Sequence, residues 1–223
     1  LNGNFDRLIG SQNGAGYWCY SPNNNGCNDS SVTQLAMAGL AAARGVYSDP
    51  VLADAGRLAS LDAATARTRT AYANNGGRNG ALDGREKGLG YALGYESSYQ
   101  QTASGLWGQI IGGADLNDAN VQAYLRWLLN RYNYTDIESA RNSWSSTYLY
   151  YMWSSAKAYT FLDDSGVEPD AGNQTPDDLG LLPSNQAPAY AQRLVRLEPN
   201  QVQRVGRRGA GGAGYYAHPR EPA

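Results

Sequence analysis

The sequence is poor in the residues that most catalytic sites need. Among its 223 residues there is one histidine, His218, in a segment rich in glycine and proline near the end of the sequence. This placement disfavours serine- and cysteine-type sites, which pair their nucleophile with an imidazole. It also makes His218 a poor zinc ligand. We therefore expect no intact catalytic motif, no metal site and no cofactor.

Cysteine is also scarce. Cys19 and Cys27 are the only two, and they flank a loop that contains Pro22 and several asparagines. A disulfide that closes this loop is geometrically feasible, and it would indicate a secreted or periplasmic chain. Two separate thiols, compatible with the cytoplasm, are the alternative. Because the sequence begins with Leu1 and shows no signal peptide, we expect a processed or truncated piece of a longer protein.

Net charge and long apolar runs are equally limited. The formal net charge of -2 argues against a nucleic-acid or anionic-membrane partner. No run of about 18 apolar residues is present, so we expect no membrane span. Phenylalanine is rare, with 2 residues against 17 tyrosines and 5 tryptophans. Tyrosine and tryptophan carry polar groups, and they are therefore suited to surfaces that remain partly wet.

Helical patterns of two kinds alternate along the first 165 residues. Three stretches are apolar around nearly their whole circumference, which is typical of buried helices; they are residues 30–44, 97–112 and 145–162. Two stretches have one apolar face, which is typical of outer helices; they are residues 50–64 and the segment after a cap at Asn117 or Asp118.

Capping residues give expected helix ends. Asp29 or Ser30 is the expected N-cap of the first helix, and Gly45 its expected stop. Pro50 is expected in the first turn of the second helix. After Asn117 or Asp118, the apolar stripe consists of Val121, Tyr124, Leu125, Leu128 and Tyr132, with Gln122, Arg126 and Asn130 off the stripe.

A unit made of a Gly-Tyr turn followed by a helix start occurs twice. One copy contains Gly16-Tyr17-Trp18 and then Asp29 to Ala36, the other Gly94-Tyr95 and then Glu96 to Ala103; Ser143-Trp144 opens a candidate third. Repetition at roughly 40–70 residues is typical of repeat folds. Residues 74–90 are predicted to form a loop, and the prolines after Gly166 exclude long helices. We expect a repeat domain over residues 1–165 and an irregular region over 166–223, where Gly214-Tyr215 resembles the start of a further repeat.

These features together resemble the prenyltransferase and squalene-cyclase repeat superfamily. The resemblance covers residues 9–162 and is carried by the Gly-Tyr turns, the helix start at Asp29 to Ala36 and the outer helix at Asn120 to Leu128. It implies an all-α fold, an α/α toroid with inner and outer helices around a central cavity, here as an incomplete ring. Many bacterial proteins of the superfamily have no assigned role.

The catalytic motifs of that superfamily are absent. The cyclases use an Asp-x-Asp-Asp motif, and neither Asp163-Asp164 nor Asp177-Asp178 has the additional Asp. The prenyltransferases bind zinc through Asp, Cys and His, and the thioester domains need Gly-Cys-Gly-Glu-Gln. Gly26-Cys27-Asn28 departs from that sequence directly after the cysteine.

The candidate site residues are therefore aromatic. Eight are predicted to line the cavity wall: Tyr17, Trp18, Tyr95, Trp107, Trp144, Tyr148, Tyr151 and Trp153. Tyr20 and Tyr91 occur at the same loop-to-helix junctions. Packing within the core is the alternative for all of them.

Two carboxylates, Asp29 and Glu96, are expected at the mouth of the cavity, with helix capping as the alternative role. The predicted function is a non-catalytic module that binds an apolar isoprenoid-like ligand, a sugar or a protein partner. An enzyme fragment of terpenoid-cyclase or carbohydrate-active type, with catalytic residues partly outside this sequence, is the second hypothesis.

Overall fold

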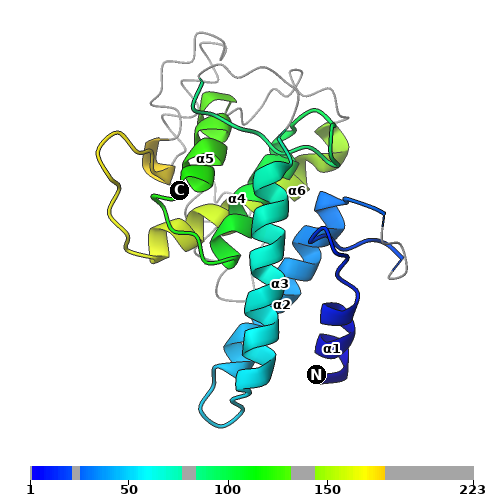
Figure 1. Cartoon of the computed structure of the whole chain (residues 1–223). Coiled ribbons are helices and arrows are strands. Elements are labelled where there is room, and N and C mark those ends of the chain that lie inside the picture. The colour runs from blue at the N-terminus through cyan, green and yellow to red at the C-terminus, as the bar shows by residue number, and fades with distance from the viewer. Residues whose placement is uncertain (1, 22–25, 77–83, 132–143, 179–223) are drawn as a thin grey trace, which may run out of the picture.

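The computed structural model describes residues 2–21, 26–76, 84–131 and 144–178, and this part of the chain is helical (Figure 1). Its elements are α1 (Asn2–Gly10), α2 (Ser30–Tyr47), α3 (Ala55–Asn74), α4 (Tyr99–Ile111), α5 (Ala119–Arg131), α6 (Trp144–Asp164) and the 3-10 helix η1 (Pro176–Asp178). Within these ranges the only β-type pairings are two isolated bridges between loop residues. The predicted all-α class is confirmed.

Helix α4 lies at the centre of the fold. Its residues from Tyr99 to Gln109 are all buried. It packs against α2, α3, α5 and α6 (Figure 1). The prediction of a helix buried on all sides is confirmed for this segment.

Helix α2 begins as predicted and ends later than predicted. Asp29 is its N-cap, and the Asp29 side chain accepts hydrogen bonds from the backbone N–H groups of Ser31 and Val32. The stop at Gly45 is wrong, because Gly45 lacks the positive φ that commonly ends a helix and the chain continues to Tyr47. The all-round burial is also wrong for α2, since Leu35 is 60% exposed.

Helix α3 begins at Ala55, beyond the predicted start at Pro50, which lies in a turn. Asp54 provides the cap, and its Oδ1 accepts from the backbone N–H of Arg57 at 3.0 Å. A side-chain acceptor at this place satisfies an end N–H group, which proline cannot do. The helix also continues to Asn74, beyond the predicted end at residue 64. It has one buried face, but the predicted residues of that face are wrong: Val51, Leu52, Ala55 and Ala59 are exposed and Leu58 is half-buried. The buried residues are Leu61, Ala64, Thr65, Thr68, Ala71 and Tyr72.

Helix α5 carries the predicted apolar stripe, of which Tyr132 lies outside the described residues. Gln122 and Arg126, expected on the exposed side, are also buried. Residues 167–178 cover them: the Gln122 Nε2 donates to the Gln174 carbonyl at 2.9 Å, and the Gln122 Oε1 accepts from the Gln174 N–H at 2.8 Å. The Arg126 guanidinium donates to the carbonyl of Gly172. A second layer of chain therefore covers this outer helix.

A polar junction connects α2, α4 and α6. The Gln34 Nε2 donates to Ser154 Oγ at 2.6 Å, and Ser104 Oγ donates to Gln34 Oε1 at 2.6 Å. All three residues are almost completely buried. Buried polar groups that satisfy one another in this way fix the register of neighbouring helices.

None of the helices in the described ranges is long and apolar enough to cross a membrane. Residues 166–178 are irregular apart from η1, whereas 179–223, including the expected start of a further repeat, lie outside the described residues.

Candidate functional site

Four tyrosines and one aspartate, from four segments of the chain, come together where α2 begins. Tyr20 follows Cys19, Asp29 caps α2, Tyr91 and Tyr95 lie in the loop before α4, and Tyr150 lies in α6. The Tyr91 hydroxyl donates to Asp29 Oδ2, and the Tyr91 and Tyr95 rings lie 6.1 Å apart between centroids. Asp29, Tyr20 and Tyr91 all act electrostatically on Tyr150. We call these five residues the tyrosine–aspartate face.

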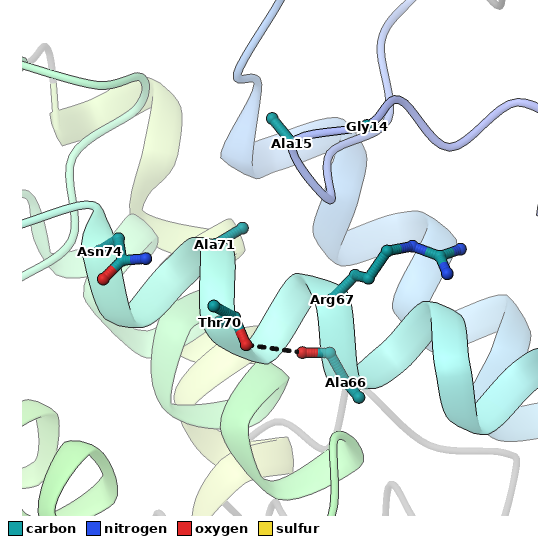
Figure 2. Close-up of a pocket in the computed structure, with 7 residues that line it drawn as sticks. All are labelled: Gly14, Ala15, Ala66, Arg67, Thr70, Ala71 and Asn74. Carbon is teal, nitrogen blue, oxygen red and sulfur yellow. Dashed lines mark hydrogen bonds between the residues drawn. The ribbon is translucent and has the colours of Figure 1, made fainter.

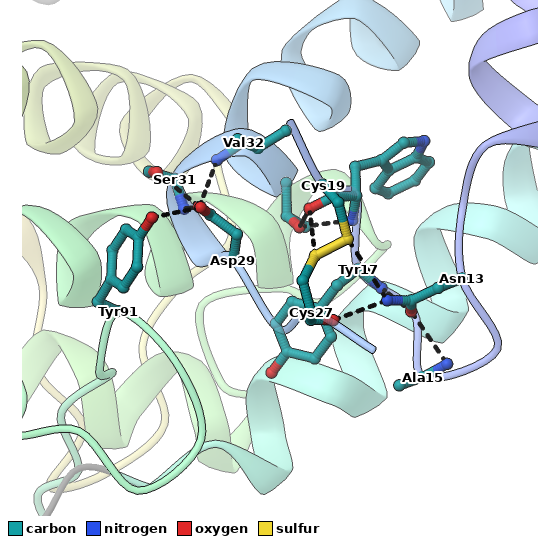
Figure 3. The surroundings of a disulfide bond; sticks show 11 residues. Asn13, Ala15, Tyr17, Cys19, Cys27, Asp29, Ser31, Val32 and Tyr91 are labelled. Carbon is teal, nitrogen blue, oxygen red and sulfur yellow. Dashed lines mark hydrogen bonds between the residues drawn. A yellow bond between two sulfur atoms is a disulfide. The ribbon is translucent and has the colours of Figure 1, made fainter. Parts of the chain in front are cut away.

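The Asp29 carboxylate is held in a fixed orientation. Its Oδ1 accepts from the backbone N–H groups of Ser31 and Val32 at 2.9 and 3.0 Å, and from Ser31 Oγ at 2.6 Å. Tyr91 donates to the other oxygen (Figure 3). The carboxylate also lies at the N-terminus of α2, where the helix dipole favours negative charge. Four donors therefore hold the carboxylate in place.

The hydroxyls of Tyr91 and Tyr150 are protonated at neutral pH. Acceptance of its hydrogen bond by Asp29, followed by burial, raises the pKa of Tyr91 to about 12. Burial, with smaller contributions from Asp29, Tyr20 and Tyr91, raises the pKa of Tyr150 well above its usual range. The Tyr150 hydroxyl lies 3.0 Å from Ser104 Oγ, which connects the face to the polar junction. Both hydroxyls therefore remain donors.

The loop that carries Tyr91 and Tyr95 is attached to the first turn of α2. The Ser30 N–H donates to the carbonyl of Tyr91 at 3.0 Å, and Ser30 Oγ donates to the carbonyl of Gly90 at 3.0 Å. Gly94 has a φ of +81°, a conformation that glycine adopts without strain. The tyrosine that follows this turn projects from the fold and is 59% exposed.

The loop that carries Tyr20 is closed by a disulfide between Cys19 and Cys27, whose Cα atoms lie 6.1 Å apart (Figure 3). Asn13 connects this loop to the preceding segment: its Nδ2 donates to the Cys27 carbonyl at 2.7 Å, and its Oδ1 accepts from the Tyr17 N–H at 3.0 Å. The disulfide therefore restrains the segment between Tyr20 and Asp29.

The six predicted wall residues whose side chains the structure describes divide between two buried cores and the surface. Four of them are buried with exposures of 1–3%, namely Tyr17, Trp18, Trp107 and Tyr151. Trp18 packs in the cluster of α1, α2 and α3, and the other three pack in the cluster around α4. Burial of this degree favours the packing alternative that the sequence left open.

The other four predicted wall residues differ in their surroundings. Trp153 is half-buried, with its ring 5.1 Å from that of Trp107. The side chains of Trp144 and Tyr148 lie outside the described part. Tyr95 alone joins the tyrosine–aspartate face.

Of the two predicted carboxylates, Asp29 is buried in the face and also caps α2, whereas Glu96 is exposed. The N-cap of α4 is Ser98. Tyr150 was missed as a site residue, because it stands in a run of aromatic residues that gives no indication of which one bonds to Ser104. Its contact partners, 46 or more residues away in sequence, supply no local signal.

A pocket between the N-terminal loop and α3 has few functional groups. It has a volume of about 350 Å³ and is lined by Gly14, Ala15, Ala66, Arg67, Thr70, Ala71 and Asn74 (Figure 2). Its one charged group, Arg67, donates to Gln12 Oε1 at 2.8 Å. No lining residue is aromatic, acidic or nucleophilic apart from the Thr70 hydroxyl, which donates to the Ala66 carbonyl.

Metal-binding groups are not assembled in the part of the chain that the structure describes, where no cluster of three or more His, Cys, Asp or Glu side chains occurs. Comparison of the chain with protein-family models, with curated proteins and with solved structures finds no match. The function is therefore argued from the tyrosine–aspartate face itself.

Proposed function

We propose that this chain is a non-catalytic helical module that binds a carbohydrate at the tyrosine–aspartate face. The observation that carries the proposal is the pairing of Tyr91 with Asp29 beside the exposed ring of Tyr95. Sugar rings have apolar C–H faces that stack on aromatic rings, and hydroxyl groups that need fixed polar partners. The face supplies both kinds of contact.

The polarity of the face favours a sugar over an isoprenoid-like ligand. Asp29 carries a negative charge, and the Tyr91 and Tyr150 hydroxyls are protonated donors. These groups already bond within the fold, but an apolar chain would displace water from their remaining hydrogen-bonding positions and offer no hydrogen bond in return. A ligand with several hydroxyl groups replaces the hydrogen bonds to water that binding removes.

The proposal of a non-catalytic role rests on the carboxylates. Glycoside hydrolysis uses two carboxylates at a defined separation, one of them with a raised pKa. In the described face Asp29 is the buried acid, and its oxygens already accept four hydrogen bonds. Asp29 is the one carboxylate among the five residues of the face, so the second carboxylate that hydrolysis needs is not among them.

We also propose that the helices form an arc of an α/α toroid. The packing of α4 against both α2 and α6, with α3 against α2 and α4 and with α5 against α4, supports that arrangement. In such an arc the tyrosine–aspartate face lies where the inner helices α2 and α4 begin, which is where the superfamily resemblance would place a ligand.

The proposal is tested with a broad glycan array followed by calorimetry on the best ligand. The double variant Tyr91→Ala/Tyr95→Ala removes the stacking rings, and we expect it to weaken binding by about tenfold or more, since one aromatic stack contributes about 1 kcal/mol. Phe161→Ala is the control, because it removes an exposed aromatic ring about 16 Å farther along α6 than Tyr150. No binding to any glycan, or equal losses in both variants, contradicts the proposal.

A further inference from the structure

The tyrosine–aspartate face has an excess of hydrogen-bond acceptors and of negative charge. The Asp29 carboxylate is 7% exposed. Its partners are neutral donors, namely two backbone N–H groups and the hydroxyls of Ser31 and Tyr91. Arginines pair instead with Asp6, Asp54, Asp62 and Asp118. The charge of Asp29 is therefore balanced by dipoles and not by a cation.

A second acceptor lies in α4, the helix whose Ser104 bonds to Tyr150. Gln100 is 5% exposed, and its Oε1 has no hydrogen-bond partner among the described residues. Gln100 stands one turn before Ser104 in α4, and Ser104 Oγ accepts or donates the bond to Tyr150. Residues four apart lie on the same side of a helix, so Gln100 is on the side of α4 that Tyr150 contacts. A buried acceptor without a partner is costly, and a ligand donor would remove that cost.

The aromatic rings of the face also favour a positively charged ligand. Tyr20 is 83% exposed, Tyr95 59% and Tyr91 39%. The face of an aromatic ring carries negative partial charge and attracts cations, and this attraction adds to that of a nearby carboxylate. Rings, carboxylate and amide oxygen therefore all favour a ligand that donates hydrogen bonds and carries positive charge.

We propose that the ligand is an amino sugar whose unsubstituted amine is protonated, such as an oligomer of glucosamine. This inference rests on the proposed carbohydrate-binding function and specifies its ligand. The ammonium group lies against Asp29 and the ring of Tyr91, a neighbouring hydroxyl donates to the Gln100 Oε1, and the sugar ring stacks on Tyr95. A neutral sugar makes the stacking contact and leaves the carboxylate without a counter-charge.

The test compares three tetrasaccharides that share a β-1,4-linked glucose backbone and differ at carbon 2. The glucosamine tetramer carries an ammonium group there, the N-acetylglucosamine tetramer an acetamide and cellotetraose a hydroxyl. Calorimetry at low ionic strength is expected to show the glucosamine tetramer binding at least about tenfold more tightly than the other two. The advantage shrinks as salt is added.

Two isosteric variants separate a local contact from general attraction to an acidic protein. Asp29→Asn removes the charge and retains an N-cap acceptor, and it is expected to abolish most of the advantage of the glucosamine tetramer. Asp54→Asn makes the same change at the N-cap of α3 and is expected to leave binding unchanged. Equal effects of the two variants overturn the inference.

The remaining outcomes separate this inference from the function on which it rests. If the three tetrasaccharides bind with equal affinity and Tyr91→Ala/Tyr95→Ala weakens all of them, the amino-sugar inference fails and the carbohydrate-binding proposal stands. If none of them binds and the glycan array is blank, both fail.

Discussion

Thr33 and Thr102 occupy the same position in two different helices and make the same hydrogen bond. Thr33 is the fourth residue of α2, and its Oγ1 accepts from the backbone N–H of Trp18 at 2.9 Å. Thr102 is the fourth residue of α4, and its Oγ1 accepts from the backbone N–H of Leu89 at 3.0 Å. In both units a buried threonine thus attaches the preceding loop to the helix that follows it.

Replacement of either threonine by valine is expected to destabilise the fold. Valine preserves the shape and removes the acceptor, so a buried backbone N–H is left without its partner, at a cost of about 1–3 kcal/mol. Urea unfolding of Thr33→Val and Thr102→Val measures this change. Thr70→Val is the matched control, because the Thr70 hydroxyl is exposed and bonds only to its own helix. Stabilities equal to that of the control would show that these bonds contribute nothing.

The bond between Tyr91 and Asp29 predicts a pH dependence at the alkaline end. The folded-state pKa of Tyr91 is raised to about 12, whereas an unfolded tyrosine titrates near 10. The folded chain thus holds this proton more tightly, and the resulting stability is fully present below about pH 10 and lost as the pH rises through about 12. Asp29→Asn is expected to lower the pKa of Tyr91, as measured from the NMR shift of its labelled Cζ. A pKa that does not change in the variant contradicts the assignment.

The disulfide predicts a loss of stability on reduction. Cys19 and Cys27 are 8 residues apart, and closing a loop of this size stabilises the folded state by about 2–3 kcal/mol in the chain-entropy treatment. Unfolding in denaturant with and without a dithiol reductant measures the difference. The variant Cys19→Ser/Cys27→Ser should resemble the reduced chain and show no response to the reductant. Equal stabilities of the oxidised and reduced chains would refute the prediction.

The contact between Gln122 and Gln174 predicts that Gln122 contributes measurably to holding the segment 167–178 against α5. Gln122→Leu removes both hydrogen bonds to the Gln174 backbone, and we expect faster hydrogen exchange at the Gln174 amide together with a loss of about 1–3 kcal/mol. Asn120→Ala, on the same helix, is the control and should leave that exchange unchanged. Unaltered protection of residues 167–178 in Gln122→Leu would show that other contacts retain the segment.

Local patterns in the sequence predicted the helices well where a single physical cause determines them. The burial of α4 follows from its small and apolar residues, and the cap of α2 follows from the position of Asp29 before an apolar stretch. The stop at Gly45 failed because Gly45 does not adopt the positive φ that commonly ends a helix, and the helix continues to Tyr47. Pro50 failed as a helix start because Asp54 offers the better cap.

Contacts between residues far apart in the sequence could not be predicted from local patterns. Tyr91 meets Asp29 across 62 residues, and Gln122 is buried by a segment about 50 residues away. Amphipathic patterns identify which residues avoid water, but they do not identify which polar residues a later segment covers. The same limit applies to the aromatic residues: Trp18 and Trp107 serve two separate cores, and their spacing does not distinguish a core position from a cavity wall.

The central claim is that carbohydrate binds at the tyrosine–aspartate face, and NMR of the chain with labelled tyrosine rings tests it most directly. The glucosamine tetramer and cellotetraose are titrated in parallel, with the signals assigned by Tyr→Phe variants. We predict saturable shifts of the Tyr20, Tyr91 and Tyr95 ring signals, with the buried rings of Tyr72 and Tyr124 unaffected. Shifts confined to rings outside the face, or no shift with either sugar, would contradict the account.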